Sequence, residues 1–498
     1  MINEFGEAVW IGGAHPFDLH EVYFDFRSPR VKGGVGDVVE LLISADARYK
    51  LWLNGQFVAR GPARSYPHSQ SFDRLDLSAA WQKGDNLLAV QVYQPGYSHF
   101  SYVHRAVSGL LAALLVNGSQ QLVSDASWHV RRNRSFASQV PRVSIYGSGV
   151  EIRNMELDDV WQRVGFVEKG WQAARVIASA DGHIWHGLRE RDTPMLVERE
   201  AEMQLIECRL GEDDFMFEEA HWALREAWMG GSSAEFSSTN GWFQPHLTFD
   251  TTALFLFDLG RAYTCQGWAE IRGASGGEVV NISYADKMVN GELVISDPQT
   301  YCRVRMTDSF ALRKGNQIVE PFAMRGGRYV LFQISGEVGK NFKLRPHLRV
   351  AEYPLTITKP FTSNDLQLAA IAAMCENTLL ACLQDSFVDC VWRESSQWLG
   401  DGLIQSKIMA AMCADFRPMR KLLHDTAAGQ DQYGMLPSVA PAEVHAYTIP
   451  RYGLMWLELL NFYFAATGDA EFVRELWPTL TRQLGLYKAL NVGQEFGK

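Results

Sequence analysis

The spacing of apolar residues changes near residue 360, and this change constrains the fold more than any other feature. Before it, short alternating segments are separated by Gly, Asn and Asp. After it, apolar residues recur at helical spacing over long segments. Alternation is typical of half-buried strands, whereas a 3.6-residue period is typical of helices. The sequence therefore predicts a multidomain protein in which β domains precede a helical region.

The region before residue 360 contains two blocks of strands. In residues 1–155, the segment 49–53 alternates, Asn54-Gly55 is a hairpin turn, and residues 56–59 continue as the next strand. Many short strands with regular turns are typical of a β-sandwich or jelly roll. We expect antiparallel sandwiches at 1–155 and 246–356, joined by an irregular β linker at 156–245. Further strands are expected at 38–44, 87–93, 110–116, 127–130, 253–260, 269–272, 278–284 and 328–334.

The region 360–498 is expected to be helical. Ser363 or Asn364 can cap a first helix that runs to about residue 383. Helix pairs with functional loops between them fit part of an α/α barrel, and a simple helical array is the alternative. The other helices are expected near 402–414, 416–428, 452–466 and 471–489.

Composition limits the classes of function. The 498 residues carry a formal charge of −10, which disfavours binding to nucleic acid and is compatible with a neutral carbohydrate. The seven cysteines form no Cys-x-x-Cys pair, so free thiols in a reducing compartment are the simpler interpretation. The first residues lack a secretory signal, and no apolar run reaches the roughly 18 residues of a membrane helix. We expect a cytoplasmic protein with no membrane contact, no metal site and no cofactor.

One segment, residues 389–401, concentrates chemically active side chains. Three acids (Asp389, Glu394 and Asp401) lie there with Arg393 and two tryptophans. Glycosidases need carboxylic acids to protonate a leaving oxygen and to position the sugar. A structural Asp–Arg–Glu network at a helix start would have the same spacing, and on spacing alone it is the more common explanation.

The side chains of this segment suggest distinct roles. A general acid must carry a proton at neutral pH, and apolar surroundings or a neighbouring carboxylate would favour that form of Glu394. Trp392 and Trp398 can stack on a sugar, although buried core positions are more common for tryptophan. His445 and Tyr447 follow in a proline-containing loop and can either reach the same pocket or pack the loop.

The chain resembles bacterial α-L-rhamnosidases of glycoside hydrolase family 78 over nearly its whole length. The family motif is Asp-Cys-Pro-x-Arg-Glu-x-x-Gly-Trp-x-Gly-Asp. Matching it in register are Asp389, Cys390, Arg393, Glu394, Trp398, Gly400 and Asp401. Residues 43–56, 61–62, 72–73 and 83–86 resemble the family's N-terminal, carbohydrate-binding-like sandwich, and residues 257–260, 273–276, 284–286, 320–322 and 327–330 resemble its next one. Residues 434–437 and 467–469 match later segments.

This resemblance implies two jelly-roll-like sandwiches followed by part of an (α/α)6 six-hairpin barrel. It implies inverting hydrolysis of terminal non-reducing α-L-rhamnose from glycosides or polysaccharides, with Glu394 as the general acid. By the same resemblance Asp389, Arg393 and Asp401 hold the rhamnose, and Trp398 forms part of the pocket wall.

Two features depart from the family pattern. Val391 replaces a proline, and Gln397 replaces a glycine, which can alter the loop that holds Glu394. In the family the general base lies further along the barrel, whereas this sequence ends at Lys498, so no residue is assigned that role. We expect either a fragment, a homodimer or second chain that completes the barrel, or an inactive relative. The alternative functions are a non-catalytic carbohydrate-binding protein and an α/α-barrel enzyme acting on another glycan.

Overall fold

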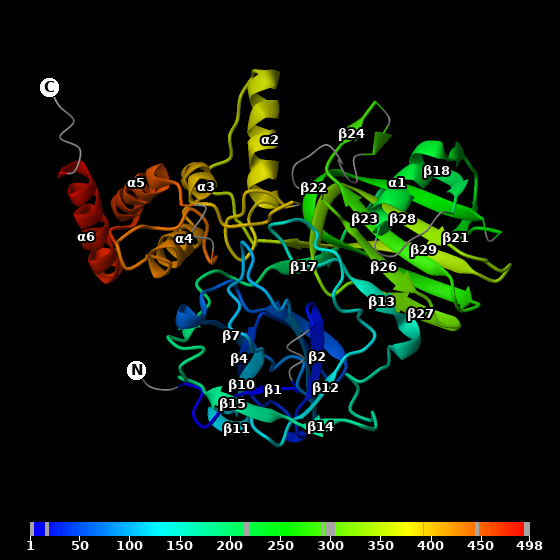
Figure 1. The fold of residues 1–498 in the computed structure, drawn as a ribbon, viewed down its shortest axis with the longest axis horizontal. Helices are drawn as coiled ribbons and strands as arrows, with labels where there is room; N and C mark the ends of the chain where they lie inside the picture. The colour runs from blue at the N-terminus through cyan, green and yellow to red at the C-terminus, as the bar shows by residue number, and fades with distance from the viewer. Residues whose placement is uncertain are drawn as a thin grey trace.

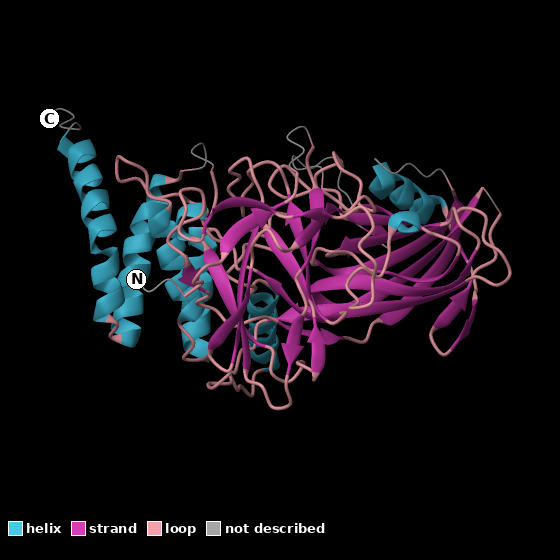
Figure 2. Ribbon diagram, turned by 90° about the horizontal axis from the view of Figure 1, so that it is seen from below, coloured by secondary structure: helices cyan, strands magenta, loops and turns pink. Residues whose placement is uncertain are grey.

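The structure is a computed structural model with a β-rich part and a helical part (Figure 1). It describes residues 4–14, 19–213, 219–248, 250–290, 292–293, 304–391, 393–443 and 448–492. Strands fill most of the molecule, and most helices gather at one end (Figure 2). The expected order of β domains followed by a helical region is confirmed.

The first β domain is a sandwich of two sheets. Alternate residues of both sheets, among them Ile43, Leu51 and Val90, meet in a shared core. The seven-stranded sheet has the order β15 (Arg175–Ser179), β1 (Val9–Gly12), β10 (Gly109–Val116), β4 (Val39–Asp46), β7 (Ser71–Asp76) and β16 (Arg189–Glu190), with β11 (Ser119–Val123) paired to β10. The six-stranded sheet has the order β14 (Gln172–Ala173), β12 (His129–Arg132), β2 (Val22–Arg27), β9 (Leu88–Gln94), β5 (Arg48–Leu53) and β6 (Gln56–Gly61). A small ribbon joins β3 (Val31–Gly33) to β8 (Gly84–Asn86).

The second β domain is one 12-stranded sheet that folds over its own core. Its central strand, β22 (Thr251–Ala274), pairs with β18 (Gln204–Glu212) and β28 (Arg325–Ser335) in its first half, and with β27 (Gly315–Val319) and β29 (Lys343–Glu352) in its second. Both halves contribute to the same apolar core. The other strands are β13 (Ile152–Asn154), β17 (Val197–Glu200), β19 (Ser232–Ser233), β20 (Ser237–Thr239), β21 (Trp242–Gln244), β23 (Val279–Ala285) and β26 (Thr307–Ala311), with a separate ribbon of β24 (Met288–Val289) and β25 (Glu292–Leu293).

The helical part follows the second β domain. It contains α2 (Leu366–Ala381), α3 (Leu399–Met412), α4 (Arg417–Ala428), α5 (Pro450–Thr467) and α6 (Ala470–Val492). Leu403, Leu422, Trp456 and Leu460 form its core. The remaining helix, α1 (Ala220–Gly230), packs against the second β domain, as does α2 against β22. No helix within the described ranges is both long and apolar enough to cross a membrane.

Several expected boundaries differ from the structure. The region 156–245, expected to be an irregular linker, adds β14–β16 to the first domain and β17–β21 to the second, because its short segments pair with strands distant in sequence. The first helix begins at neither Ser363 nor Asn364. Instead the side chain of Asp365 caps α2 by accepting hydrogen bonds from the backbone N–H groups of Gln367 and Leu368. The strands expected at 253–260 and 269–272 are two parts of β22.

The helical part also exposes large apolar side chains. They include Leu366 and Met374 on α2, which are 85% and 61% exposed, and Trp477 on α6, which is 58% exposed. Lone exposed apolar residues are ordinary, but α2 alone exposes four of them, Leu366, Leu368, Ile371 and Met374.

Candidate active site

The acidic segment 389–401 contributes the second part of the loop between α2 and α3 and the first turn of α3. The loop closes on itself, since the backbone N–H of Asp389 donates to the carbonyl of Ser396 at 2.9 Å. In return, the backbone N–H of Ser396 donates to Oδ1 of Asp389, also at 2.9 Å. This pairing folds residues 389–396 into a closed turn, and the charge of Glu394 acts on both Asp389 and Asp401.

Glu394 is held through both of its carboxylate oxygens. Nη2 of Arg393 donates to Oε1 at 2.8 Å, and the indole Nε1 of Trp398 donates to Oε2 at 2.9 Å. Only 10% of the Glu394 side chain is exposed, while 43% of the Arg393 side chain is. The carboxyl group therefore has a fixed orientation, and the guanidinium of Arg393 beside it is partly exposed.

Burial and the charge of Glu394 contribute to a raised pKa in the two other acids of the motif. Burial raises the pKa of Asp389 to about 6, and the charge of Glu394 contributes to the rise. Burial also raises the pKa of Asp401, again with Glu394 as a contributor. Burial, together with the nearby negative charge, therefore favours the protonated forms of Asp389 and Asp401, a pattern found at many acid–base sites.

Asp389 makes stability depend on pH in a defined direction. Its folded-state pKa of about 6 exceeds its ordinary value of 3.8, so the folded protein binds more protons between these values. The stabilising contribution is complete below pH 3.8 and is lost as the pH rises through about 6. We therefore expect Asp389→Asn to gain free energy of unfolding relative to the wild type as pH rises from 4 to 7, measured by urea unfolding. A constant difference between the two proteins across this range would contradict the assignment.

Trp398 connects the motif to both flanking parts of the molecule. Its ring lies 5.6 Å from that of Phe100 in the first sandwich and 6.4 Å from that of Tyr452 on α5, both in edge-on contacts. Its indole N–H donates to Glu394, so the residue orients the acid and packs between Phe100 and Tyr452. Trp392, His445 and Tyr447 lie outside the described residues.

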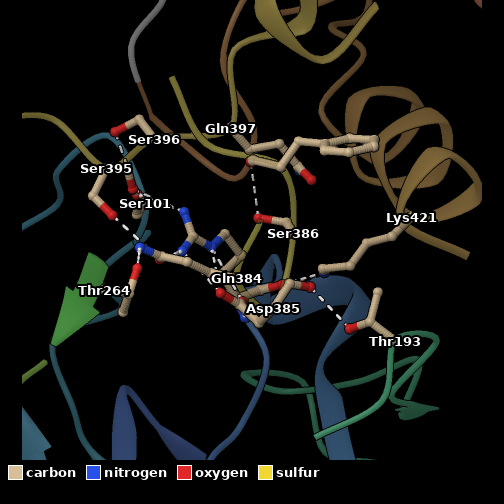
Figure 3. A network of polar contacts seen from close by, with 12 residues as sticks. Ser101, Thr193, Thr264, Gln384, Asp385, Ser386, Ser395, Ser396, Gln397 and Lys421 are labelled. Atoms are coloured by element: carbon tan, nitrogen blue, oxygen red, sulfur yellow. Dashed lines mark hydrogen bonds and ion pairs between the residues drawn. The ribbon is translucent and has the colours of Figure 1, made fainter. Parts of the chain in front are cut away.

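The first sandwich holds the motif loop through a contact that the sequence did not reveal. Arg64 forms an ion pair with Asp385 at 2.8 Å, and its Nη1 donates to the carbonyl of Ser395 at 2.9 Å. Oγ of Ser101 donates to the same carbonyl at 3.0 Å. Figure 3 shows this network of polar contacts between the β domains and the helical part. The loop is therefore held by residues of the first sandwich that lie about 300 positions earlier in the chain.

Gln397, one of the two departures from the family motif, has a structural role. Its side chain is buried, and Nε2 donates to Oδ2 of Asp425 at 3.0 Å and to the carbonyl of Ala440 at 2.8 Å. Val391, the other departure, is buried against Gly326 of β28, where an added Cβ would lie 2.5 Å from the Val391 carbonyl. Both substitutions thus tie the loop to neighbouring elements.

A cavity of about 750 Å³ opens beside the loop, between the two β domains and the helical part. Arg393, Glu394 and Ser395 contribute to its lining. This volume can accommodate a small glycan. Within the described ranges, no group of three or more His, Cys, Asp or Glu side chains is arranged to hold a metal ion.

Comparison with known proteins agrees with this architecture. Residues 357–495 match the model of the bacterial alpha-L-rhamnosidase 6 hairpin glycosidase domain. The helical region is therefore similar to the bacterial α-L-rhamnosidase six-hairpin domain. The family resemblance read from the motif is thereby confirmed for this region. None of the curated proteins matches the chain.

Solved rhamnosidase structures share the whole architecture at low sequence identity. The family 78 rhamnosidase of Bacillus sp. GL1 has a TM-score of 0.83 and 18% identity, covering 96% of this chain and 69% of its own. The α-L-rhamnosidase from Dictyoglomus thermophilum has a TM-score of 0.71 and 17% identity, with 98% of this chain and 52% of its own covered.

A third structure is the Streptomyces avermitilis α-L-rhamnosidase complexed with L-rhamnose. It has a TM-score of 0.65 and 18% identity, covering 93% of this chain and 42% of its own. This chain therefore shares with these three structures the fold of the two β domains and of the first helices of the six-hairpin domain. It spans about half the length of the Dictyoglomus and Streptomyces proteins.

Proposed function

We propose that this chain carries the acid side of an inverting α-L-rhamnosidase active site, which releases terminal α-L-rhamnose from glycosides or polysaccharides. Glu394 would donate a proton to the departing glycosidic oxygen. Asp389, Arg393 and Asp401 would hold the sugar hydroxyls, and Trp398 would form part of the wall. One observation carries the proposal: the in-register motif folds into a closed loop in which Arg393 and Trp398 fix the Glu394 carboxyl group.

The surroundings of Glu394 suit this step. A proton donor needs a defined direction toward the leaving oxygen, and the N–H groups of Arg393 and Trp398 fix the orientation of this carboxyl group. Because both groups donate to the ionised form, one of the two contacts has to open when Glu394 takes up the proton that it delivers. Neighbouring Asp389 and Asp401, both with raised pKa, favour retaining a proton within the cluster. Inversion requires a second carboxylate at about 6.5–9.5 Å to activate water from the opposite face. We assign that role to none of the described residues.

Hydrolysis of 4-nitrophenyl α-L-rhamnopyranoside, followed by NMR of the released sugar, tests the proposal. We expect rhamnose to appear first as the β-anomer, because single displacement inverts the configuration. 4-Nitrophenyl α-D-glucopyranoside, which has the same leaving group, should be cleaved far more slowly. Initial release of the α-anomer would contradict inversion. Binding of L-rhamnose without turnover would favour a carbohydrate-binding protein, and absence of both would overturn the proposal.

A further inference from the structure

The cavity beside the motif loop is lined by several lysines and arginines, and one of these side chains has no carboxylate partner among the described residues. Its lining contains the motif residues Arg393 and Glu394 and, from the first sandwich, Arg48 at the start of β5 and the buried His99. Every other lysine and arginine in this lining lies within ion-pair distance of a carboxylate. Within the described residues, the guanidinium of Arg48 has neither an ion pair nor a hydrogen bond.

Arg48 is an exposed residue at the wall of the cavity. Its side chain is therefore accessible both to water and to a molecule bound in the cavity. The protein atoms around it lower its pKa by displacing water, and the nearby charge of Arg64 lowers it further. Because no group in the described part of the chain pairs with this guanidinium at the cavity wall, its N–H donors are available to a bound anion.

His99 can supply a second donor to the same space. Its Nδ1 accepts the backbone N–H of Ser101 at 3.3 Å, which assigns the ring proton to Nε2. Burial lowers the pKa of His99 well below its ordinary value, and Arg48 is the charge that contributes most. The imidazole is therefore neutral near pH 7 and presents an N–H group beside the guanidinium.

We propose that Arg48 and His99 form a subsite for a sugar carboxylate, so that the glycan bound in this cavity contains a uronic acid. A guanidinium fork matches the two oxygens of a carboxylate. The positive charge of Arg48 balances one negative charge, and His99 adds a neutral N–H donor. This pair therefore favours a carboxylate over a phosphate dianion. The subsite deepens the proposed function and rests on it for the identity of the ligand as a glycan, since the same cavity reaches Glu394.

Binding of D-glucuronate and D-glucose to the full chain, measured by titration calorimetry at pH 7, tests this subsite. The two sugars differ only in the carboxylate, so their affinity ratio isolates its contribution. We expect glucuronate to bind about 10- to 100-fold more tightly than glucose, as for a hydrogen-bonded charged group. Arg48→Gln should abolish the difference, and Arg48→Lys should retain part of it because the charge remains without the planar fork.

Arg30→Gln is the matched control, because Arg30 is a sandwich arginine that pairs with Asp85 at the surface, outside the cavity. Its affinity ratio should equal that of the wild type. Equal affinities for both sugars, a ratio that survives Arg48→Gln, or phosphate binding as tightly as glucuronate would each overturn the subsite. Glucuronate binding requires no turnover, so a failure here is distinguishable from a failure of the rhamnosidase proposal.

Discussion

Replacement of Glu394 by glutamine is expected to lower kcat for rhamnoside hydrolysis by about 10²- to 10⁴-fold, the usual contribution of general acid catalysis. Glutamine has the same shape but cannot deliver a proton. An amide also places an N–H₂ group against either Arg393 or Trp398, both of which donate to Glu394. Affinity for L-rhamnose should change much less than kcat, because the sugar is held mainly by other residues.

Comparing substrates with different leaving groups distinguishes a proton donor from a residue that only shapes the loop. Nitrophenolate departs with little protonation, so Glu394→Gln should slow 4-nitrophenyl rhamnoside less than an alkyl rhamnoside. Glu458→Gln is a suitable control, since Glu458 is an exposed glutamate on α5 that pairs with Lys407. An equal loss on both substrates would indicate a structural role, and full activity of Glu394→Gln would exclude it as the acid.

Much of the fold follows from local sequence patterns. The hairpin expected at Asn54-Gly55 is present, because both residues adopt positive φ and Leu53 pairs with Gln56. The helices expected after residue 400 also lie close to α3–α6, since their apolar spacing persists over several turns. Long periodic segments are predictable because each of them determines its own buried face.

Features that depend on distant partners were not predictable. The strands β14–β16 are short and have little periodicity of their own, yet they pair with the first sandwich. The helix α1 was not expected, although its Leu224 and Trp228 pack against β22 and β28 residues. In such segments the tertiary neighbour, rather than local propensity, decides the conformation.

The candidate site was likewise predictable where its residues are adjacent in sequence, and not where they come from distant parts of the chain. The motif alone indicated Glu394 and its flanking acids, because they are adjacent in sequence. Arg64 and Ser101, which hold the carbonyl of Ser395, are separated from it by about 300 residues and carry no motif of their own. The replacement of a motif glycine by Gln397 suggested a disturbed loop, whereas its amide joins the loop to α4.

The hydrogen bond between the Gln397 amide and α4 depends on Asp425, which lies at the centre of a buried polar cluster. Its Oδ2 accepts hydrogen bonds from Nζ of Lys421 at 2.8 Å and from the amide of Gln397 at 3.0 Å. The side chains of Lys421 and Asp425 are only 4% and 7% exposed. Lys421 also donates to the carbonyl of Arg64 at 2.6 Å, so the cluster links α4, the motif loop and the first sandwich.

Asp425→Ala is expected to lower the free energy of unfolding of the helical part by about 3–5 kcal/mol, the usual result of removing one partner of a buried ion pair. Urea unfolding followed by circular dichroism at 222 nm measures this loss. The variant leaves Lys421 buried without a counter-charge and removes an acceptor from Gln397. Rhamnoside turnover should fall as well, because the motif loop loses its connection to α4.

The double variant Lys421→Met, Asp425→Ala separates charge burial from packing. It removes both charges, so most of the lost stability should return, and equal stability of the single and double variants would refute the explanation. The wild type supplies a pH test of the same pair. Burial opposes ionisation of Asp425, but Lys421 and His424 outweigh it and hold the pKa at about 2, below the ordinary 3.8. The stabilising contribution is therefore complete above pH 3.8 and is lost as the pH falls through about 2, so the wild type and Asp425→Ala should converge in stability only at that acid limit.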